Sequence, residues 1–145
     1  MFLGQYFYTL DTKGRLIIPS RYREHLQGEF VITRGLDHCI TLYPNNVWDE
    51  IASKVTALPI TDPRGRALRR IFFSDATKVE LDRQGRILIP DRLREIAGLT
   101  TGTEVAIVGL DRFIELWDPD EWQRQNEKQS EFEVQDPEIW GGLSI

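Results

Sequence analysis

Hydrophobic and polar residues alternate in short runs along the first half of the chain, a pattern that predicts β-strands joined by tight turns. The strands expected from alternating or β-branched runs cover residues 5–10, 16–18, 30–33 and 40–43. Asp11 to Gly14 forms a turn signal, because aspartate can bond its own downstream backbone and glycine tolerates positive φ. The first two strands are therefore predicted to pair as a hairpin with its turn at Lys13-Gly14.

Helices are expected where a capping or helix-opening residue follows one of these strands. A short helix is predicted over 20–26, capped by Ser20, and a longer one over 45–57. Residues 58–63 contain two prolines and form the expected junction between the halves, which a helix over 64–73 follows.

The second half of the chain repeats the first. The segment LDTKGRLIIPSRYRE, which begins at Leu10, returns as LDRQGRILIPDRLRE beginning at Leu81, with nine of fifteen positions identical at an offset of 71. A second block, residues 34–48, matches residues 108–122 at an offset of 74. Internal repeats dictate architecture, so the same elements are expected twice. They are strands at 78–81, 87–89, 104–108 and 113–117, helices from Asp91 and from Pro119 to about Phe132, and an irregular tail after Asp136.

One repeat is too small to fold alone, since a domain of fewer than about 60 residues is marginal. Two repeats that bury their strand faces against each other would form one barrel-like core with a pseudo-dyad. The expected organisation is one repeat over 5–57, a linker helix over 58–75, a second repeat over 76–130 and a C-terminal tail over 131–145.

Charge is unevenly distributed along the 145 residues, whose formal net charge is −5. Residues 111–145 hold ten acidic and three basic residues and account for −7, so the rest of the chain carries +2. Basic residues cluster at 11–23, 62–70 and 82–94, and because salt screens charges beyond about 8 Å, such patches act locally. No apolar run approaches the ~20 residues of a membrane span, no signal peptide is evident, and a single cysteine is typical of a reducing cytoplasm.

Arginine residues beside the two repeated turns are the strongest candidates for function. Arg15 and Arg86 each follow the glycine of an Asp-x-x-Gly-Arg turn, and two further arginines follow the proline in each copy. Guanidinium groups suit forked contacts with phosphate oxygens or with guanine in the major groove, which a hairpin fits. The alternative is that Asp11–Arg15 and Asp82–Arg86 are surface ion pairs that only close their turns. The number of arginines shared by both copies exceeds what turns require and favours DNA contact by at least one of this pair.

Other candidate chemistry is weak. The basic segment over 64–70 is expected to be a solvated helix face, with a phosphate-contacting helix as the alternative. His38 and Cys39 have no further histidine or cysteine at ligand spacing, so neither a metal nor a cofactor is expected. Cys39 is expected in the core, and the matching Trp48 and Trp122 in core or subunit packing. No P-loop, dinucleotide motif or carboxylate pair with a pocket signature is present, so no enzyme activity is expected.

The doubled LDxxGRxxIPxRxRE motif, the start MFLGQYFYTLD and the paired Gly-Leu-Asp blocks resemble the MraZ family over about residues 1–135. The resemblance implies an α+β fold, a pseudo-two-fold duplicated, double-split (swapped-hairpin) β-barrel of two SpoVT/AbrB-type repeats with flanking short helices. The DNA-binding residues expected from the motif and its adjacent arginines are Lys13, Arg15, Arg21, Arg23, Arg83, Arg86, Arg92 and Arg94. The turn and structural positions are Asp11, Gly14, Pro19, Asp82, Gly85 and Pro90. The second copy departs from the family pattern with Gln84 in place of the turn lysine, which leaves Arg83 as a substitute cation.

The resemblance further implies a transcriptional repressor in the cytoplasm, associated with the nucleoid, that binds G-rich direct repeats in its own promoter region of the division and cell-wall gene cluster. It implies double-stranded DNA as the partner and a ring-shaped homo-oligomer, with no membrane and no small-molecule substrate. A ring would repeat a modest basic patch, so that weak contacts act together through effective concentration. The rival is an antitoxin-like interaction module, because other swapped-hairpin proteins capture a toxin with an acidic tail, although antitoxin chains usually carry one copy.

Overall fold

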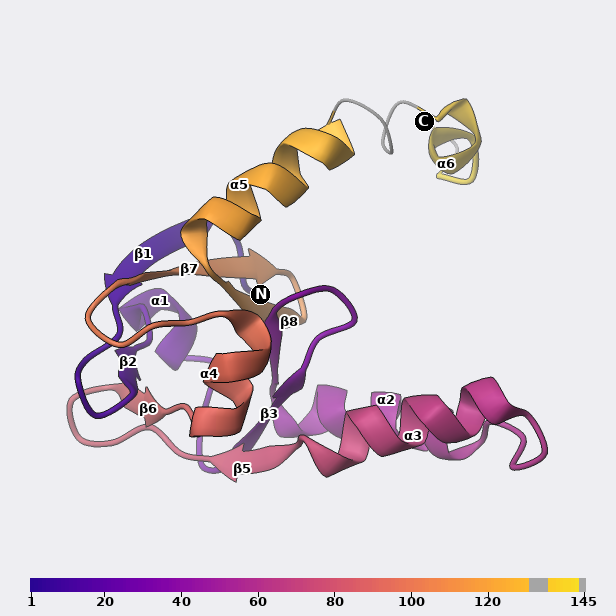
Figure 1. Ribbon diagram of the computed structural model, residues 1–145, viewed down its shortest axis with the longest axis horizontal. Helices are drawn as coiled ribbons and strands as arrows, with labels where there is room; N and C mark the ends of the chain where they lie inside the picture. Colours follow the sequence, from indigo (N-terminus) through magenta and orange to yellow (C-terminus); the bar gives the residue numbers. More distant parts are fainter. Residues whose placement is uncertain (131–135, 144–145) are drawn as a thin grey trace.

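The computed structural model describes residues 1–130 and 136–143. The elements of the first half are β1 (Gln5–Thr9), β2 (Arg15–Ile17), α1 (Ser20–Arg23), β3 (Phe30–Arg34), β4 (Ile40–Tyr43) and α2 (Asn45–Thr56). The connecting helix is α3 (Pro63–Ser74). The elements of the second half are β5 (Thr77–Val79), β6 (Arg86–Leu88), α4 (Asp91–Ala97), β7 (Glu104–Leu110), β8 (Phe113–Trp117), α5 (Pro119–Lys128) and α6 (Pro137–Gly141). The fold is α+β, and the predicted order of strand, strand, helix, strand, strand and helix occurs twice (Figure 1).

Every ladder between the described strands is antiparallel. Six strands form one sheet in the order β1-β7-β8-β4-β3-β5, and β2 and β6 form a separate two-stranded ribbon. Strands β1 to β4 of the first half correspond to β5 to β8 of the second. The β1–β7 pair therefore has its counterpart in β5–β3, and the β3–β4 pair has its counterpart in β7–β8. The β2–β6 and β4–β8 pairs each join two corresponding strands. The strand pairing is therefore two-fold symmetric, and each half completes the sheet of the other.

Two expectations about these strands are wrong. β1 and β2 do not pair as a hairpin, since Phe7 of β1 pairs with Ala106 of β7, and Leu16 of β2 pairs with Ile87 of β6. The described strands also form no closed barrel, because β1 and β5 are the two ends of an open sheet and the ribbon is separate from it. The turn residues fix where the chain reverses, but the ladder partner is set by the pairing that buries the apolar face.

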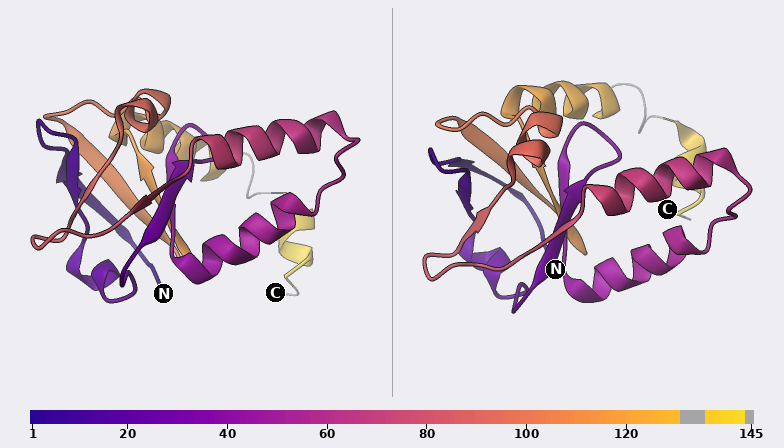
Figure 2. Two further views of the ribbon diagram at one scale, coloured as in Figure 1. Left: turned by 90° about the horizontal axis from the view of Figure 1, so that it is seen from below. Right: turned by 60° about the horizontal axis from the view of Figure 1, so that its bottom comes forward.

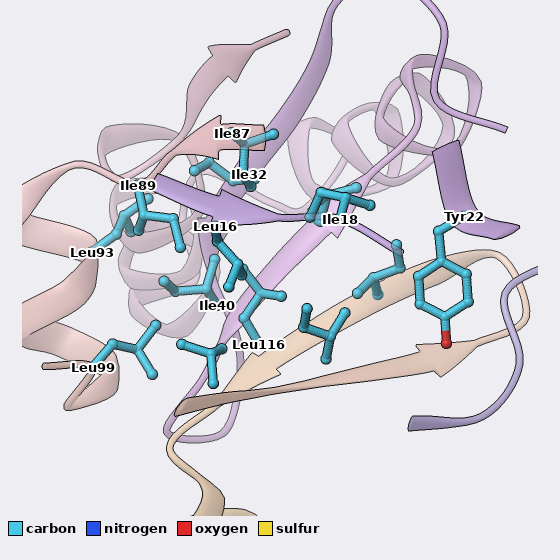
Figure 3. Packing of buried hydrophobic residues seen from close by; sticks show 14 of the residues in the cluster. Leu16, Ile18, Tyr22, Ile32, Ile40, Ile87, Ile89, Leu93, Leu99 and Leu116 are labelled. Carbon is cyan, nitrogen blue, oxygen red and sulfur yellow. The ribbon is translucent and has the colours of Figure 1, made fainter. Parts of the chain in front are cut away.

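One apolar core joins the two halves. Leu16 and Ile87, the central residues of the ribbon strands, belong to the same buried cluster as Ile40 of β4 and Leu116 of β8 (Figure 3). All four side chains are at most 1% exposed. Because each half contributes residues to the same cluster, neither half buries its own apolar face without the other.

Helices α2 and α3 form an antiparallel pair that projects away from the sheet (Figures 1 and 2). Arginines of α3 hold the connection between these helices. Arg66 donates to the carbonyl oxygen of Ile60 (2.7 Å), Arg69 donates to that of Leu58, and Arg64 pairs with the N-cap aspartate of α3 (2.9 Å). The helix predicted over 64–73 is confirmed, and three of its four arginines bind within this connection.

Smaller differences concern helix ends. Pro19 is the N-cap of α1, so Ser20 lies inside the helix and does not cap it through its side chain. The segment after Asp136, expected to be irregular, contains α6, whose Glu138 backbone N–H donates to the Asp136 carboxylate (3.0 Å). The predicted end of α5 near Phe132 lies outside the described residues. No described helix is long and apolar enough to cross a membrane.

Separate halves of the chain are expected not to fold. The ladder partners of β1 and β2 are β7 and β6, which lie in the other half, and the core is shared. A polypeptide of residues 1–71 should therefore show no cooperative thermal transition by circular dichroism, and mixing it with residues 72–145 should restore one. A cooperative melt of monomeric 1–71 would contradict the shared core.

Candidate nucleic-acid interface

The turn between β1 and β2 is built around the carboxylate of Asp11. Its Oδ1 accepts hydrogen bonds from the backbone N–H groups of Lys13 (2.9 Å) and Arg15 (2.8 Å), and its Oδ2 accepts one from Nε of Arg15 (2.7 Å). Gly14, at φ +82°, donates its N–H to the Asp11 carbonyl oxygen (3.0 Å). One carboxylate thus fixes both the backbone of the turn and the direction of the Arg15 guanidinium.

The turn between β5 and β6 repeats this arrangement. Oδ1 of Asp82 accepts from the N–H groups of Gln84 and Arg86 (both 2.9 Å), and Oδ2 accepts from Nε of Arg86 (2.8 Å). In both turns the hydrogen bonds, foremost that from the backbone N–H of the arginine, hold the pKa of the aspartate below its ordinary value. Both carboxylates are therefore ionised at neutral pH and hold their arginines in place, so the ion pairs expected as an alternative are present.

Each turn glycine lies against an arginine of the other repeat. A Cβ at Gly14 would collide with the guanidinium of Arg94, and a Cβ at Gly85 would lie 2.7 Å from Cζ of Arg23. The glycine carbonyl of each turn also accepts a hydrogen bond, at 2.9 Å, from the residue that precedes the proline in the other repeat. The close approach that glycine permits is therefore made by the opposite repeat of the same chain.

The ribbon brings the two turn arginines onto one outward face. Successive strand residues point to alternate faces of the ribbon. The buried Leu16 and Ile87 point into the core, so Arg15 and Arg86 point outward from the other face. The side chains of Arg15 and Arg86 are 33% and 23% exposed. Nη1 of Arg86 lies 3.9 Å from Oδ2 of Asp11, so this arginine also reaches across the ribbon to the other turn. The two turns thus form a single charged surface.

The eight cations predicted to bind DNA do not all occupy equivalent positions. Exposed or half-exposed positions on the ribbon, its turns and α1 are held by Lys13, Arg15, Arg21, Arg83 and Arg86. The other three lie on α1 and α4 and, like Arg15 and Arg86, make contacts within the chain. Arg94 pairs with Asp91 and is 17% exposed, and Nε of Arg23 is buried without a hydrogen-bond partner among the described residues.

Arg92, the third of these, has a side chain that is 70% exposed, but its Nε is held by a buried acidic residue that the sequence analysis did not single out. Oδ1 of Asp75 accepts a hydrogen bond from Nε of Arg92 (2.7 Å), and Nε of Arg34 lies 3.7 Å from Oδ2. The Asp75 side chain is 2% exposed, so it ties the end of α3 to α4 and β3 from inside the fold. Gly4 occupies the equivalent place in the first repeat, so comparing the two copies gives no signal for Asp75.

The remaining candidates lie in packed positions. Cys39 is fully buried, and burial foremost raises the pKa of its thiol, which confirms the prediction of a core residue. Trp48 stacks on Phe72 with ring centroids 4.7 Å apart, and Trp122 packs against Trp117 at 5.7 Å. Within the described part of the chain, no group of three His, Cys, Asp or Glu side chains is arranged to hold a metal ion.

The fold and this surface define a class of protein: one chain with two copies of a small α+β unit, whose strands pair between the copies and whose Asp-x-x-Gly-Arg turns flank a shared ribbon. The model of one family, described as "MraZ protein, putative antitoxin-like", matches residues 1–71 and again residues 72–139. The chain belongs to the MraZ family, as its repeated motif indicates.

Named relatives align with both repeats of the chain. The transcriptional regulator MraZ of Thermomicrobium roseum is 50% identical over 127 residues, which are 88% of each chain. The transcriptional regulator MraZ of Moorella thermoacetica is 51% identical over 123 residues, 85% of each chain. That of Desulforamulus reducens is 46% identical over 126 residues, 87% of each chain. The likeness therefore extends over nearly the whole length of these relatives.

Gly85→Ala is expected to destabilise the fold by more than about 2 kcal/mol, because the new Cβ meets both a left-handed backbone (φ +77°) and the Arg23 guanidinium. Gly102→Ala is the matched control, since its φ is +84° and no atom lies within 4 Å of a Cβ there. It should lose only the ~1–2 kcal/mol of the left-handed conformation. Urea unfolding of both variants measures the difference, and equal losses would show that Arg23 does not restrict the turn.

Acid should weaken the two turns. The pKa values of Asp11 and Asp82 are lower in the folded chain than in the unfolded chain, so their ionised forms favour folding above about pH 4. This contribution disappears as the pH falls through the folded pKa values. The double variant Asp11→Asn/Asp82→Asn should therefore lose less melting temperature than the wild type between about pH 5 and pH 2. If acid lowered the melting temperatures of the two proteins by the same amount, these carboxylates would not have the proposed role.

Proposed function

We propose that this protein is a transcriptional regulator that binds double-stranded DNA with the outward face of the β2–β6 ribbon and its two turns. The observation that carries the proposal is the pair of arginines, Arg15 and Arg86, each held at Nε by an ionised aspartate and both on one exposed face. The relatives named transcriptional regulator MraZ support the same activity.

The fixed orientation of these arginines suits DNA. The carboxylate of Asp11 binds the Nε edge of Arg15, and the two terminal nitrogens of Arg15 have no hydrogen-bond partner among the described residues. Two parallel N–H groups on a guanidinium match O6 and N7 of guanine, or two phosphate oxygens. A guanidinium that is already oriented loses less side-chain entropy when it binds.

The charge distribution permits this contact although the whole chain is acidic. Lys13, Arg15, Arg83 and Arg86 face two aspartates on the ribbon and turns, which leaves a local charge of +2. The acidic excess lies in residues 111–145. Charges more than about 8 Å away are largely screened at physiological salt, so the local surface decides the attraction to DNA. A two-stranded ribbon also fits the width of the major groove.

The family suggests a finer role, which we add to the proposal. We infer that the protein acts in the cytoplasm on the nucleoid, represses its own promoter region in the division and cell-wall gene cluster, and reads G-rich direct repeats. A ring-shaped homo-oligomer would present one ribbon per subunit to successive repeats. Each ribbon is small, so the combined affinity would come from effective concentration.

Arg15→Ala tests the proposed contact. Loss of one oriented guanidinium should weaken binding to a duplex from upstream of the coding sequence about ten- to hundredfold. The melting temperature should change little, because a surface ion pair contributes only ~0–1 kcal/mol. Arg64→Ala is the control, since Arg64 is 92% exposed and also pairs with an aspartate, but lies on α3. If Arg15→Ala binds as the wild type does in a gel shift, the ribbon is not the DNA-binding surface.

A further inference from the structure

The outward face of the ribbon carries two aliphatic residues beside its two arginines. In the β2–β6 register, Arg15 lies opposite Leu88 and Ile17 lies opposite Arg86. These four residues share one face, because Leu16 and Ile87 between them point into the core. The face is thus a small checkerboard in which each guanidinium neighbours an aliphatic side chain.

Both aliphatic side chains are open to solvent. Ile17 is 43% exposed and Leu88 is 56% exposed. By contrast, Leu16 and Ile87, the middle residues of the two strands, are at most 1% exposed. The two positions are equivalent, since they are separated by the repeat offset of 71. A single exposed aliphatic residue needs no explanation. Two copies of the unit that both place one at the same outward position, next to the same arginine, indicate a common contact.

The charge around Ile17 and Leu88 indicates which kind of partner binds them. The ribbon and turns carry a local charge of +2, which favours a polyanion over a second copy of the same face. In the major groove of DNA, which admits a two-stranded ribbon, the apolar group on the base edges is the C5-methyl of thymine. Aliphatic side chains between guanidinium groups therefore match thymines beside guanines.

We propose that Ile17 and Leu88 are specificity-determining residues that pack on thymine methyl groups in the groove that Arg15 and Arg86 read. The proposal rests on the DNA-binding function inferred above and adds a second base to the guanine contact. Residues directly opposite each other on paired strands, such as Arg15 and Leu88, lie about 4.5–5.5 Å apart. At 3.4 Å per base step, the contacted thymine therefore lies within about two steps of the contacted guanine.

Replacing thymine by uracil removes only the methyl group and tests this contact directly. The probe is a duplex from upstream of the coding sequence, prepared with thymine or entirely with deoxyuridine. Wild-type protein should bind the uracil duplex more weakly, by about fourfold for each methyl contacted. The double variant Ile17→Ala/Leu88→Ala should bind the thymine duplex more weakly and should no longer distinguish the two duplexes.

Two controls accompany the double variant. Leu36→Ala removes an equally aliphatic side chain that is 88% exposed in the loop between β3 and β4, and it should retain the preference for thymine. The exchange Ile17→Leu/Leu88→Ile keeps the apolar surface and should also retain it. Thermal melts should be unchanged in all three variants because the altered side chains are exposed.

Three results would overturn the proposal. Equal binding of both duplexes by the wild type would remove the methyl contact while leaving the DNA-binding function intact. An unchanged preference in the double variant would place the methyl contact elsewhere. A smaller particle in light scattering of the double variant, with its preference retained, would assign Ile17 and Leu88 to self-association. Failure of the DNA-binding function itself is distinct, because the wild type would then bind neither duplex.

Discussion

The pairing of β2 with β6 is the constraint on which the rest of the structure depends. Each strand has only three residues, so neither turn has a rigid hairpin of its own to hold it. The ladder joins the two strands, buries Leu16 and Ile87 in the common core and turns the alternate residues outward. The position of each arginine is therefore set by the opposite repeat, and the charged surface exists only when both repeats are folded together.

The Asp–Arg pairs of the turns contribute orientation more than stability. Arg15 and Asp11 are both 33% exposed, and ion pairs in such positions contribute only ~0–1 kcal/mol to folding. The same carboxylate also accepts backbone N–H groups, so the turn and the guanidinium are fixed by one group. The two interpretations weighed for the sequence, a turn-closing ion pair and a DNA contact, are therefore compatible. An arginine bound along its Nε edge still presents its terminal nitrogens to a ligand.

Local pattern predicted most elements of this fold but not their partners. Alternation placed β8 at Phe113–Trp117, and the turn chemistry of Asp11 and Gly14 was evident from residue type. The predicted hairpin was wrong because a short apolar run can pair with any strand that buries its apolar face. In this fold the partner of β2 is the distant β6 and not the preceding β1. The approach of Arg23 to Gly85 and of Arg94 to Gly14 follows from that exchange and has no signal in the sequence. Pro19 stands in the N-cap position because its ψ of 139° is extended, and Ser20 is therefore the first residue of the helix.

The fusion of two copies in one chain allows equivalent positions to diverge, and they have done so around the ribbon. Arg21 and its counterpart Arg92 are both exposed, but only Arg92 is bound to a buried aspartate, Asp75. Lys13 of the first turn is replaced by Gln84 in the second. Two identical subunits would present a truly two-fold surface, which matches a palindromic site. Unequal halves give the ribbon a direction, and a surface with a direction suits the proposed direct repeats, because every repeat then meets its subunit in the same orientation.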